Sequence, residues 1–212
     1  MSSFKPAVSK HTLARVAKQA ELTTSYLVFM ATSGVLAAVA LLTNSVPILI
    51  GSMVIAPALP PLGLISLAIV AKKYRLALKG LTTAVLGFAI AMVSAMLVTW
   101  ILNLTQIIPP ETNLISKELL EERVKPGWYS VIAAAAAGIS GAIALVKQKT
   151  DTLVGVVAAL ALVPAIAAAG IAFLSKDSAM GFGGLILLGI NVGFIIVSGI
   201  LTVVILRPEQ RS

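Results

Sequence analysis

The sequence contains no cysteine and a single histidine, His11. Without a thiol the chain can form no disulfide, provide no thiol nucleophile and ligate no iron–sulfur cluster. Asp and Glu together number only 8 in 212 residues, and all lie outside the long apolar stretches. No cluster of acid, histidine or cysteine is therefore available there for hydrolysis, metal binding or a proton relay. We expect no catalytic residues, no metal and no cofactor, and hence a protein that is not an enzyme.

Charged residues are also scarce. They make up 11% of the chain against 58% hydrophobic residues, and the mean hydropathy is +1.03. Soluble domains have about 25% charged and about 45–50% apolar residues. The long uncharged runs, which lack the alternation of a membrane β-barrel, predict an all-α membrane protein. The net charge of +8 is typical of contacts with anionic lipid headgroups and of topology signals, and we expect no nucleic acid partner.

The uncharged runs predict six transmembrane helices, at 23–43, 46–71, 80–103, 127–146, 152–175 and 181–206. We expect a short interfacial helix before them, a basic loop at 72–79 and a short helix at 117–125 capped by Ser116. The chain then divides into a cytoplasmic segment 1–22, a membrane repeat 23–103, an extracytoplasmic loop 104–126, a second repeat 127–207 and a cytoplasmic tail 208–212. Because the first 22 residues are polar, we expect no cleavable signal peptide. Gly189 and Gly193 have GxxxG spacing, which more often indicates packing within a chain than a dimer contact.

Prolines interrupt two of the predicted spans. The stretch Gly51–Ala68 contains Pro57, Pro60 and Pro61, and the fifth span contains Pro164. Proline removes an amide donor and clashes with the preceding helical turn. We therefore predict that the second and fifth helices are broken, at Ala56–Pro61 and at Leu162–Ala165.

The two halves of the chain resemble each other at an offset of 104 residues. Residues 34–102 and 138–206 share 16 identities in 69 positions, among them Gly34 with Gly138 and Pro60 with Pro164. This composition gives roughly six identities by chance. If all six segments cross, twelve Lys and Arg lie on the side of the two termini and four on the other. The positive-inside rule then places both termini in the cytoplasm; a re-entrant second segment would weaken this asymmetry. Three crossings per repeat make the two repeats inverted.

The stretch TNSVPILIGSMVIAPALPPLGL (residues 43–64), with LVGVVAALALVPAIAAAGIA (153–172) in the second half, resembles a known prokaryotic family. It is similar to the domain of unknown function 389 family of hydrophobic membrane proteins, from about residue 30 to residue 206. Ser52 stands where alanine is common in the family, and Ala58-Leu59 where Leu-Met is common. The resemblance implies a bacterial or archaeal membrane protein, and it supplies no settled biochemical activity. We expect the cytoplasmic membrane, with another internal membrane as the alternative.

A helix that restarts after prolines has free amides and a partial positive charge at its N-terminus. Two such ends meeting at mid-membrane would hold an anion or a polar neutral solute. The substrate-binding candidates are Pro57, Pro60, Pro61, Gly63, Ser66, Ser94, Pro164, Gly170, Asn191 and Ser198. The alternative is that the prolines only kink helices, and that the serines bond to the preceding turn of their own helix.

We therefore predict a transporter or channel-like conduit for a small anionic or neutral solute. The alternative function is a non-catalytic membrane subunit or assembly factor that packs against partner helices. Ala- and Gly-rich faces favour self-association as a homo-oligomer in the lipid bilayer in either case.

Overall fold

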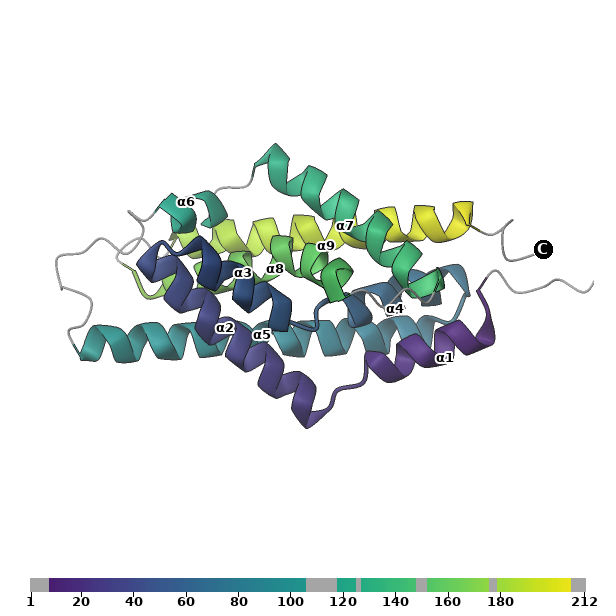
Figure 1. Cartoon of the computed structure of the whole chain (residues 1–212), viewed down its shortest axis with the longest axis horizontal. Coiled ribbons are helices and arrows are strands. Elements are labelled where there is room, and N and C mark those ends of the chain that lie inside the picture. The colour runs from purple at the N-terminus through teal and green to yellow at the C-terminus, as the bar shows by residue number, and fades with distance from the viewer. Residues whose placement is uncertain (1–7, 106–117, 125–126, 148–151, 176–178, 207–212) are drawn as a thin grey trace, which may run out of the picture.

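The computed structural model describes residues 8–105, 118–124, 127–147, 152–175 and 179–206, and all regular structure within them is helical (Figure 1). The helices are α1 (Lys10–Gln19), α2 (Thr24–Thr43), α3 (Val46–Ile55), α4 (Leu59–Val70), α5 (Tyr74–Leu104), α6 (Glu118–Val124), α7 (Trp128–Lys147), α8 (Thr152–Phe173) and α9 (Ala179–Ile205). Both predicted short helices are therefore confirmed, as α1 and α6. The predicted cap Ser116 lies outside the described residues.

Four helices, α2, α5, α7 and α9, are long and apolar enough to cross a membrane. The pair α3 and α4, bent by 51°, counts as a fifth span if it crosses as one unit. The part of α8 whose side chains the structure describes, Leu162–Phe173, is apolar and shorter than these spans. The long helices also expose large apolar side chains on their outer faces, such as Val28, Leu97, Ile132 and Val197. A helix that is apolar on its outer face as well as its inner face is suited to lipid, as in a multi-pass membrane protein.

The predicted loop 72–79 is wrong over most of its length, because α5 already begins at Tyr74. The α4 helix closes on Lys72, which has a left-handed backbone (φ 57°). The amides of Lys72 and Lys73 donate to the carbonyls of Ile69 and Ala68 at 3.0 and 2.8 Å. This Schellman-type closure turns the chain within two residues. The cations of this segment require contact with water, and they do not require a loop. The first turns of a helix satisfy the same requirement where they extend beyond the bilayer.

The two short amphipathic helices lie at opposite ends of the bundle (Figure 1). The α1 helix buries Leu13 and Val16 and packs on α4, with further contacts to α7. Its Arg15 guanidinium donates to the carbonyl of Leu145, in the last turn of α7. The α6 helix buries Leu120 and packs on α8 and α9. Each of these helices therefore covers one end of the long helices.

At the α6 end, the amide of Leu119 donates to the side-chain oxygen of Asn44 at 3.2 Å. Asn44 follows the last residue of α2 and has a left-handed backbone (φ 54°), which asparagine tolerates better than most residues. This bond joins α6 to the end of α2.

Glycines mark the closest approaches between the long helices. A Cβ added at Gly34 of α2 would collide with the backbone of Ala91 on α5, and one at Gly138 of α7 with the backbone of Ile195 on α9. Both partners of the second contact lie 104 positions beyond those of the first.

The contact between α4 and α5 recurs in the same way. A Cβ at Gly80 would lie 2.7 Å from the carbonyl oxygen of Pro61, and one at Gly184 would lie 3.1 Å from that of Ala165. These residues are again 104 positions apart in pairs. Side chains larger than hydrogen at the glycines would push the helices apart.

The GxxxG pair does not pack within the chain, contrary to our interpretation of it. Gly189 and Gly193 are exposed, and a Cβ at either would meet nothing within 4 Å. The buried face of α9 carries Asn191 and Ser198, two turns apart. Each glycine is two residues from Asn191, about 200° around the helix, and so lies on the opposite face.

Candidate functional site

The predicted break between α3 and α4 is confirmed. Ala56 has an extended backbone (φ −70°, ψ 117°), as expected for a residue whose helical conformation is disfavoured by the following ring of Pro57. The α4 helix then begins at Leu59, with Pro60 and Pro61 in its first turn. Proline is tolerated there because amides of the first turn have no intrahelical acceptor. Local sterics alone therefore explain where α3 ends and α4 begins.

The predicted break at Leu162–Ala165 is wrong, because α8 is one helix with Pro164 in its interior. Its counterpart region in the first half has three prolines, whereas α8 has one. The positions that match Pro57 and Pro61 are Ala161 and Ala165, whose amides can take part in the helix. One missing amide and one clash do not stop a helix that is packed among its neighbours.

These helix ends reduce the number of donors for an anion. The first three residues of α4 are Leu59, Pro60 and Pro61, and no side chain caps this end. Two of these three residues lack an N–H group, so the turn that would bind an anion presents one amide. At Pro164 no helix begins, so α8 adds no second set of free amides. This geometry suits an uncharged solute better than an anion.

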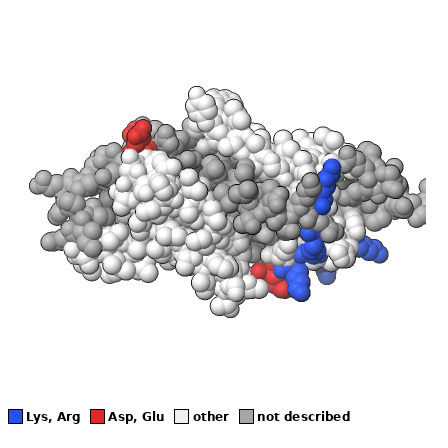
Figure 2. Space-filling model, in the orientation of Figure 1, with Lys and Arg blue, Asp and Glu red and all other residues white. Residues whose placement is uncertain are grey.

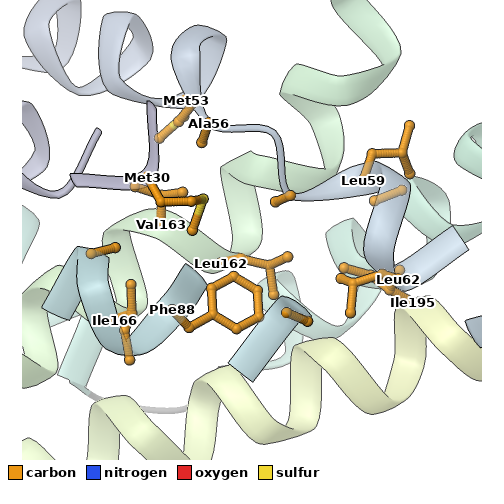
Figure 3. Packing of buried hydrophobic residues seen from close by; sticks show 14 of the residues in the cluster. Met30, Met53, Ala56, Leu59, Leu62, Phe88, Leu162, Val163, Ile166 and Ile195 are labelled. Carbon is orange, nitrogen blue, oxygen red and sulfur yellow. The ribbon is translucent and has the colours of Figure 1, made fainter. Parts of the chain in front are cut away.

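The side chains around the break are apolar. Met53 and Ala56 precede the break and Leu59 follows it, and Leu162 and Val163 of α8 belong to the same buried cluster (Figure 3). None of the five is more than 8% exposed. The α3 and α8 helices pack against each other. These five side chains therefore pack in the apolar core, whereas Pro57 and Pro60 at the break itself are partly exposed.

A small pocket lies beside the break, between α4, α7 and α9. Its lining residues are Leu59, Gly63, Ser66, Leu67, Gly138, Ala142, Ile195, Gly199 and Val203. Its cavity volume of about 10 Å³ is close to the smallest that holds one water molecule. Ser66 provides its side-chain polar group, and its hydroxyl donates to the carbonyl of Ile196 at 3.2 Å and to that of Leu62 at 3.4 Å.

The candidate site residues occupy several places. Gly63 and Ser66 line the pocket. Pro57, Pro60 and Pro61 lie at the break, Pro164 and Gly170 are buried on α8, Asn191 and Ser198 are buried on α9, and Ser94 is half-buried on α5. The remaining lining residues were not among the candidates. Of these, Gly138 carried a signal in the sequence, as the repeat partner of Gly34.

Two buried serines bond to the preceding turn of their own helix, which was the alternative to a role in solute binding. The Ser52 hydroxyl donates to the carbonyl of Leu49 at 2.6 Å, and the Ser198 hydroxyl to that of Phe194 at 2.6 Å. Both acceptors lie in the preceding turn of the same helix. Ser66 differs, since one of its two acceptors belongs to another helix.

A bundle of apolar helices around a bent pair defines a multi-pass helical membrane protein. The chain belongs to the family described as domain of unknown function (DUF389), whose model matches residues 53–197. The family resemblance is therefore confirmed. The chain is 29% identical over 173 residues to an uncharacterized protein of Methanocaldococcus jannaschii, a match that covers 82% of this chain and 51% of the relative. It therefore spans about half the length of that relative. No solved structure matches the chain.

Proposed function

We propose that this protein is a transporter or channel-like conduit for a small solute, and that the solute is uncharged rather than anionic. The observation that carries the proposal is the recurrence of the same interhelical contacts at an offset of 104 residues, in a bundle that contains a bent helix pair. Inverted repeats that meet at a discontinuous helix are a recurring plan of secondary transporters. The protein acts without catalysis.

In this proposal all six segments cross, and each half contains three spans preceded by a short amphipathic helix. The α1 to α5 helices match α6 to α9, with the pair α3 and α4 matching α8. Val16 of α1 and Leu120 of α6 support the match, because they lie 104 positions apart and both are 0% exposed. The position of α1 and α6 at opposite ends of the bundle supports an inverted relation between the halves (Figure 1).

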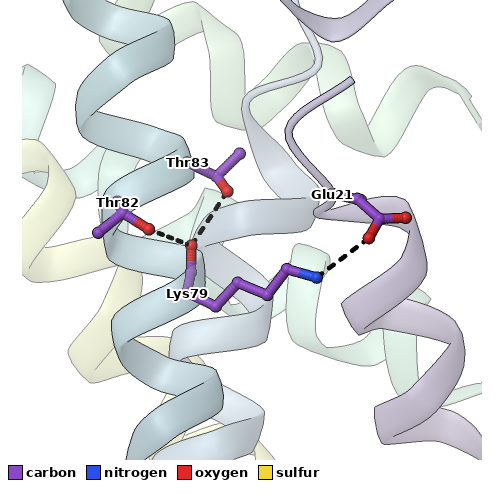
Figure 4. Close-up of polar contacts among 4 residues, drawn as sticks. All are labelled: Glu21, Lys79, Thr82 and Thr83. Atoms are coloured by element: carbon purple, nitrogen blue, oxygen red, sulfur yellow. Dashed lines mark hydrogen bonds and ion pairs between the residues drawn. The ribbon is translucent and has the colours of Figure 1, made fainter.

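The distribution of charge supports cytoplasmic termini in a bacterial or archaeal cytoplasmic membrane. Described Lys and Arg gather at the end where α1 lies, while Glu118 and Glu121 belong to α6 (Figure 2). At the α1 end, Lys79 pairs with Glu21 at 3.2 Å, while Thr82 and Thr83 donate to the Lys79 backbone carbonyl (Figure 4). Both charged side chains are about half exposed, so this end remains available to anionic lipid headgroups.

Flux into liposomes tests the proposal. Purified protein is reconstituted, and stopped-flow light scattering follows the entry of water, urea and glycerol, while anion-quenched fluorescence follows nitrate. We expect entry of at least one neutral probe above that of protein-free liposomes. A Ser66→Val substitution overfills a pocket about the size of one water molecule and should abolish that entry. The matched control is Ser94→Val, since Ser94 does not line the pocket. Flux equal to protein-free liposomes for every probe would contradict the proposal.

A second candidate is a non-catalytic membrane subunit. The outward position of Gly189 and Gly193 favours it, because they leave a smooth strip on α9 for another helix. Purification in a mild detergent separates the two functions. A foreign protein in fixed stoichiometry supports the subunit, whereas a homo-oligomer or monomer supports the conduit.

A further inference from the structure

The pocket has a counterpart position in the other half of the chain. The residues 104 positions from its lining are Val163, Ala167, Gly170 and Ile171 on α8, Gly34 and Ala38 on α2, and Ala91, Ala95 and Thr99 on α5. All of them are buried. Burial alone does not separate the two positions, because the residues that line the pocket are buried as well.

The two positions differ in what covers them. In the pocket, the Ser66 hydroxyl reaches the backbone of α9 at Ile196. Gly170 stands at the matching position of α8, and the matching residue of α5 is Met92. A Cβ at Gly170 would lie 3.1 Å from the carbonyl oxygen of Met92, 3.2 Å from its Cγ and 3.0 Å from the Cγ of Met96. At the counterpart position, two methionine side chains of α5 therefore cover the surface of α8 at Gly170.

The pocket lies toward the α1 end. A Cβ added at Gly63, which lines the pocket, would collide with the side chain of Leu145. The carbonyl of Leu145 accepts the hydrogen bond from Arg15 of α1. The counterpart lies toward the α6 end, because α6 packs on α8 and is bonded to the end of α2.

We propose that the pocket is the α1-side half of the solute path, and that Met92 and Met96 form the barrier of the α6-side half. The inference rests on the proposed function. Methionine is unbranched and has three rotatable bonds, so its side chain can leave the surface of Gly170 while the helices stay in place. The Ser66 hydroxyl, whose two hydrogen bonds are long, donates to a water-sized neutral solute in exchange for them. In the conformation described here, a space of about one water lies on the α1 side, and two methionine side chains cover the matching position on the α6 side.

The absence of cysteine allows a test by thiol labelling that does not depend on transport. Single variants Ser66→Cys and Ala167→Cys are placed in oriented membrane vesicles and exposed from either side to Ag⁺, a membrane-impermeant thiol reagent about the size of one water molecule. Unreacted thiols are then alkylated with N-ethylmaleimide in the denatured protein, and mass spectrometry gives the fraction that silver labelled. We expect Ser66→Cys to react from the α1 side, and Ala167→Cys to react more slowly from the α6 side by about tenfold or more, the ratio that 1.4 kcal/mol of closure gives.

Removing the barrier should expose the second thiol. Met92→Ala with Met96→Ala, or Met96→Ala alone if the pair does not fold, should raise labelling of Ala167→Cys from the α6 side by about tenfold or more, since these two partly buried side chains are the ones that cover Gly170. The control is Met30→Ala, a fully buried methionine of α2 that does not touch Gly170.

Equal labelling of the two thiols in the unaltered background, or no gain on shortening the methionines, would overturn the inference. Flux without this labelling pattern would leave the proposed function standing. The labelling pattern without flux would contradict the proposed function instead.

Discussion

The close approach of α2 to α5 makes Gly34→Ala the most informative substitution for the packing of the bundle. A Cβ at this position would lie 2.8 Å from both the carbonyl carbon and the Cα of Ala91. These are backbone atoms, so no rotamer change relieves the contact. The carbonyl oxygen of Ala91 would be closer still, so the two helices would have to separate by more than 0.6 Å to restore an ordinary contact of 3.4 Å.

The size of the effect follows from two terms. Overpacking of a dense interior costs about 1–3 kcal/mol, whereas replacing a mid-helix glycine by alanine contributes up to about 1 kcal/mol of helix propensity. Gly51→Ala isolates the second term, because Gly51 lies within α3 and a Cβ there meets nothing within 4 Å. The difference between the two variants is then the overpacking cost alone. For a chain of this length it corresponds to a difference in Tm of about 2–12 °C.

The assay is thermal unfolding in one detergent, followed by circular dichroism for the wild type, Gly34→Ala, Gly138→Ala and Gly51→Ala. We expect both Gly34→Ala and Gly138→Ala to melt several degrees below Gly51→Ala, because Gly138 makes the matching contact with Ile195. A Gly34→Ala protein that melts with Gly51→Ala would refute the close packing of α2 on α5. A loss confined to one of the two halves would refute the equivalence of the contacts.

Two further substitutions test single hydrogen bonds. Arg15→Ala removes the donor to the last turn of α7 and should lower stability by about 1.5–2 kcal/mol, the lower part of the range for bonds to charged groups, because the side chain is partly exposed. Lys18→Ala, on the exposed face of α1, should change nothing measurable, and equal Tm values for both would contradict the role of Arg15. Tyr26→Phe removes the bond from its hydroxyl to the carbonyl of Thr83, 3.2 Å long, and should cost about 0.5–1.5 kcal/mol in chemical unfolding. Tyr74→Phe is the control, since Tyr74 is 66% exposed, and a Tyr26→Phe protein as stable as this control would show that the buried bond contributes nothing.

Much of the local structure followed from residue type. The span boundaries predicted for α2 and α7 differ from the helices by a residue at most at each end, because charge and apolar length set where a helix meets water. The break before α4 was predictable too, since Pro57 acts on the backbone of its own neighbour. The offset of 104 residues, found by comparing the chain with itself, recurs in the contacts of Gly34 and Gly138.

The candidate site was predicted less well. Two of its ten residues, Gly63 and Ser66, line the described pocket, and the rest of that lining comes from apolar and glycine positions on three helices. Nothing about Ile195 or Val203 distinguishes them in the sequence from other apolar residues of α9. Their place in the lining depends on how α9 is rotated against α4 and α7.

The sequence by itself determined the class of this protein, the position of most helices and the break at Ala56, because each depends on composition or on contacts between near neighbours. The tertiary structure decided that α8 continues through Pro164, that Gly189 and Gly193 face outward, and that α1 and α6 cover opposite ends. These features depend on which face of each helix is packed against another. That choice is made by side chains far apart in the chain, and periodicity within one apolar helix does not show it, because every face is apolar.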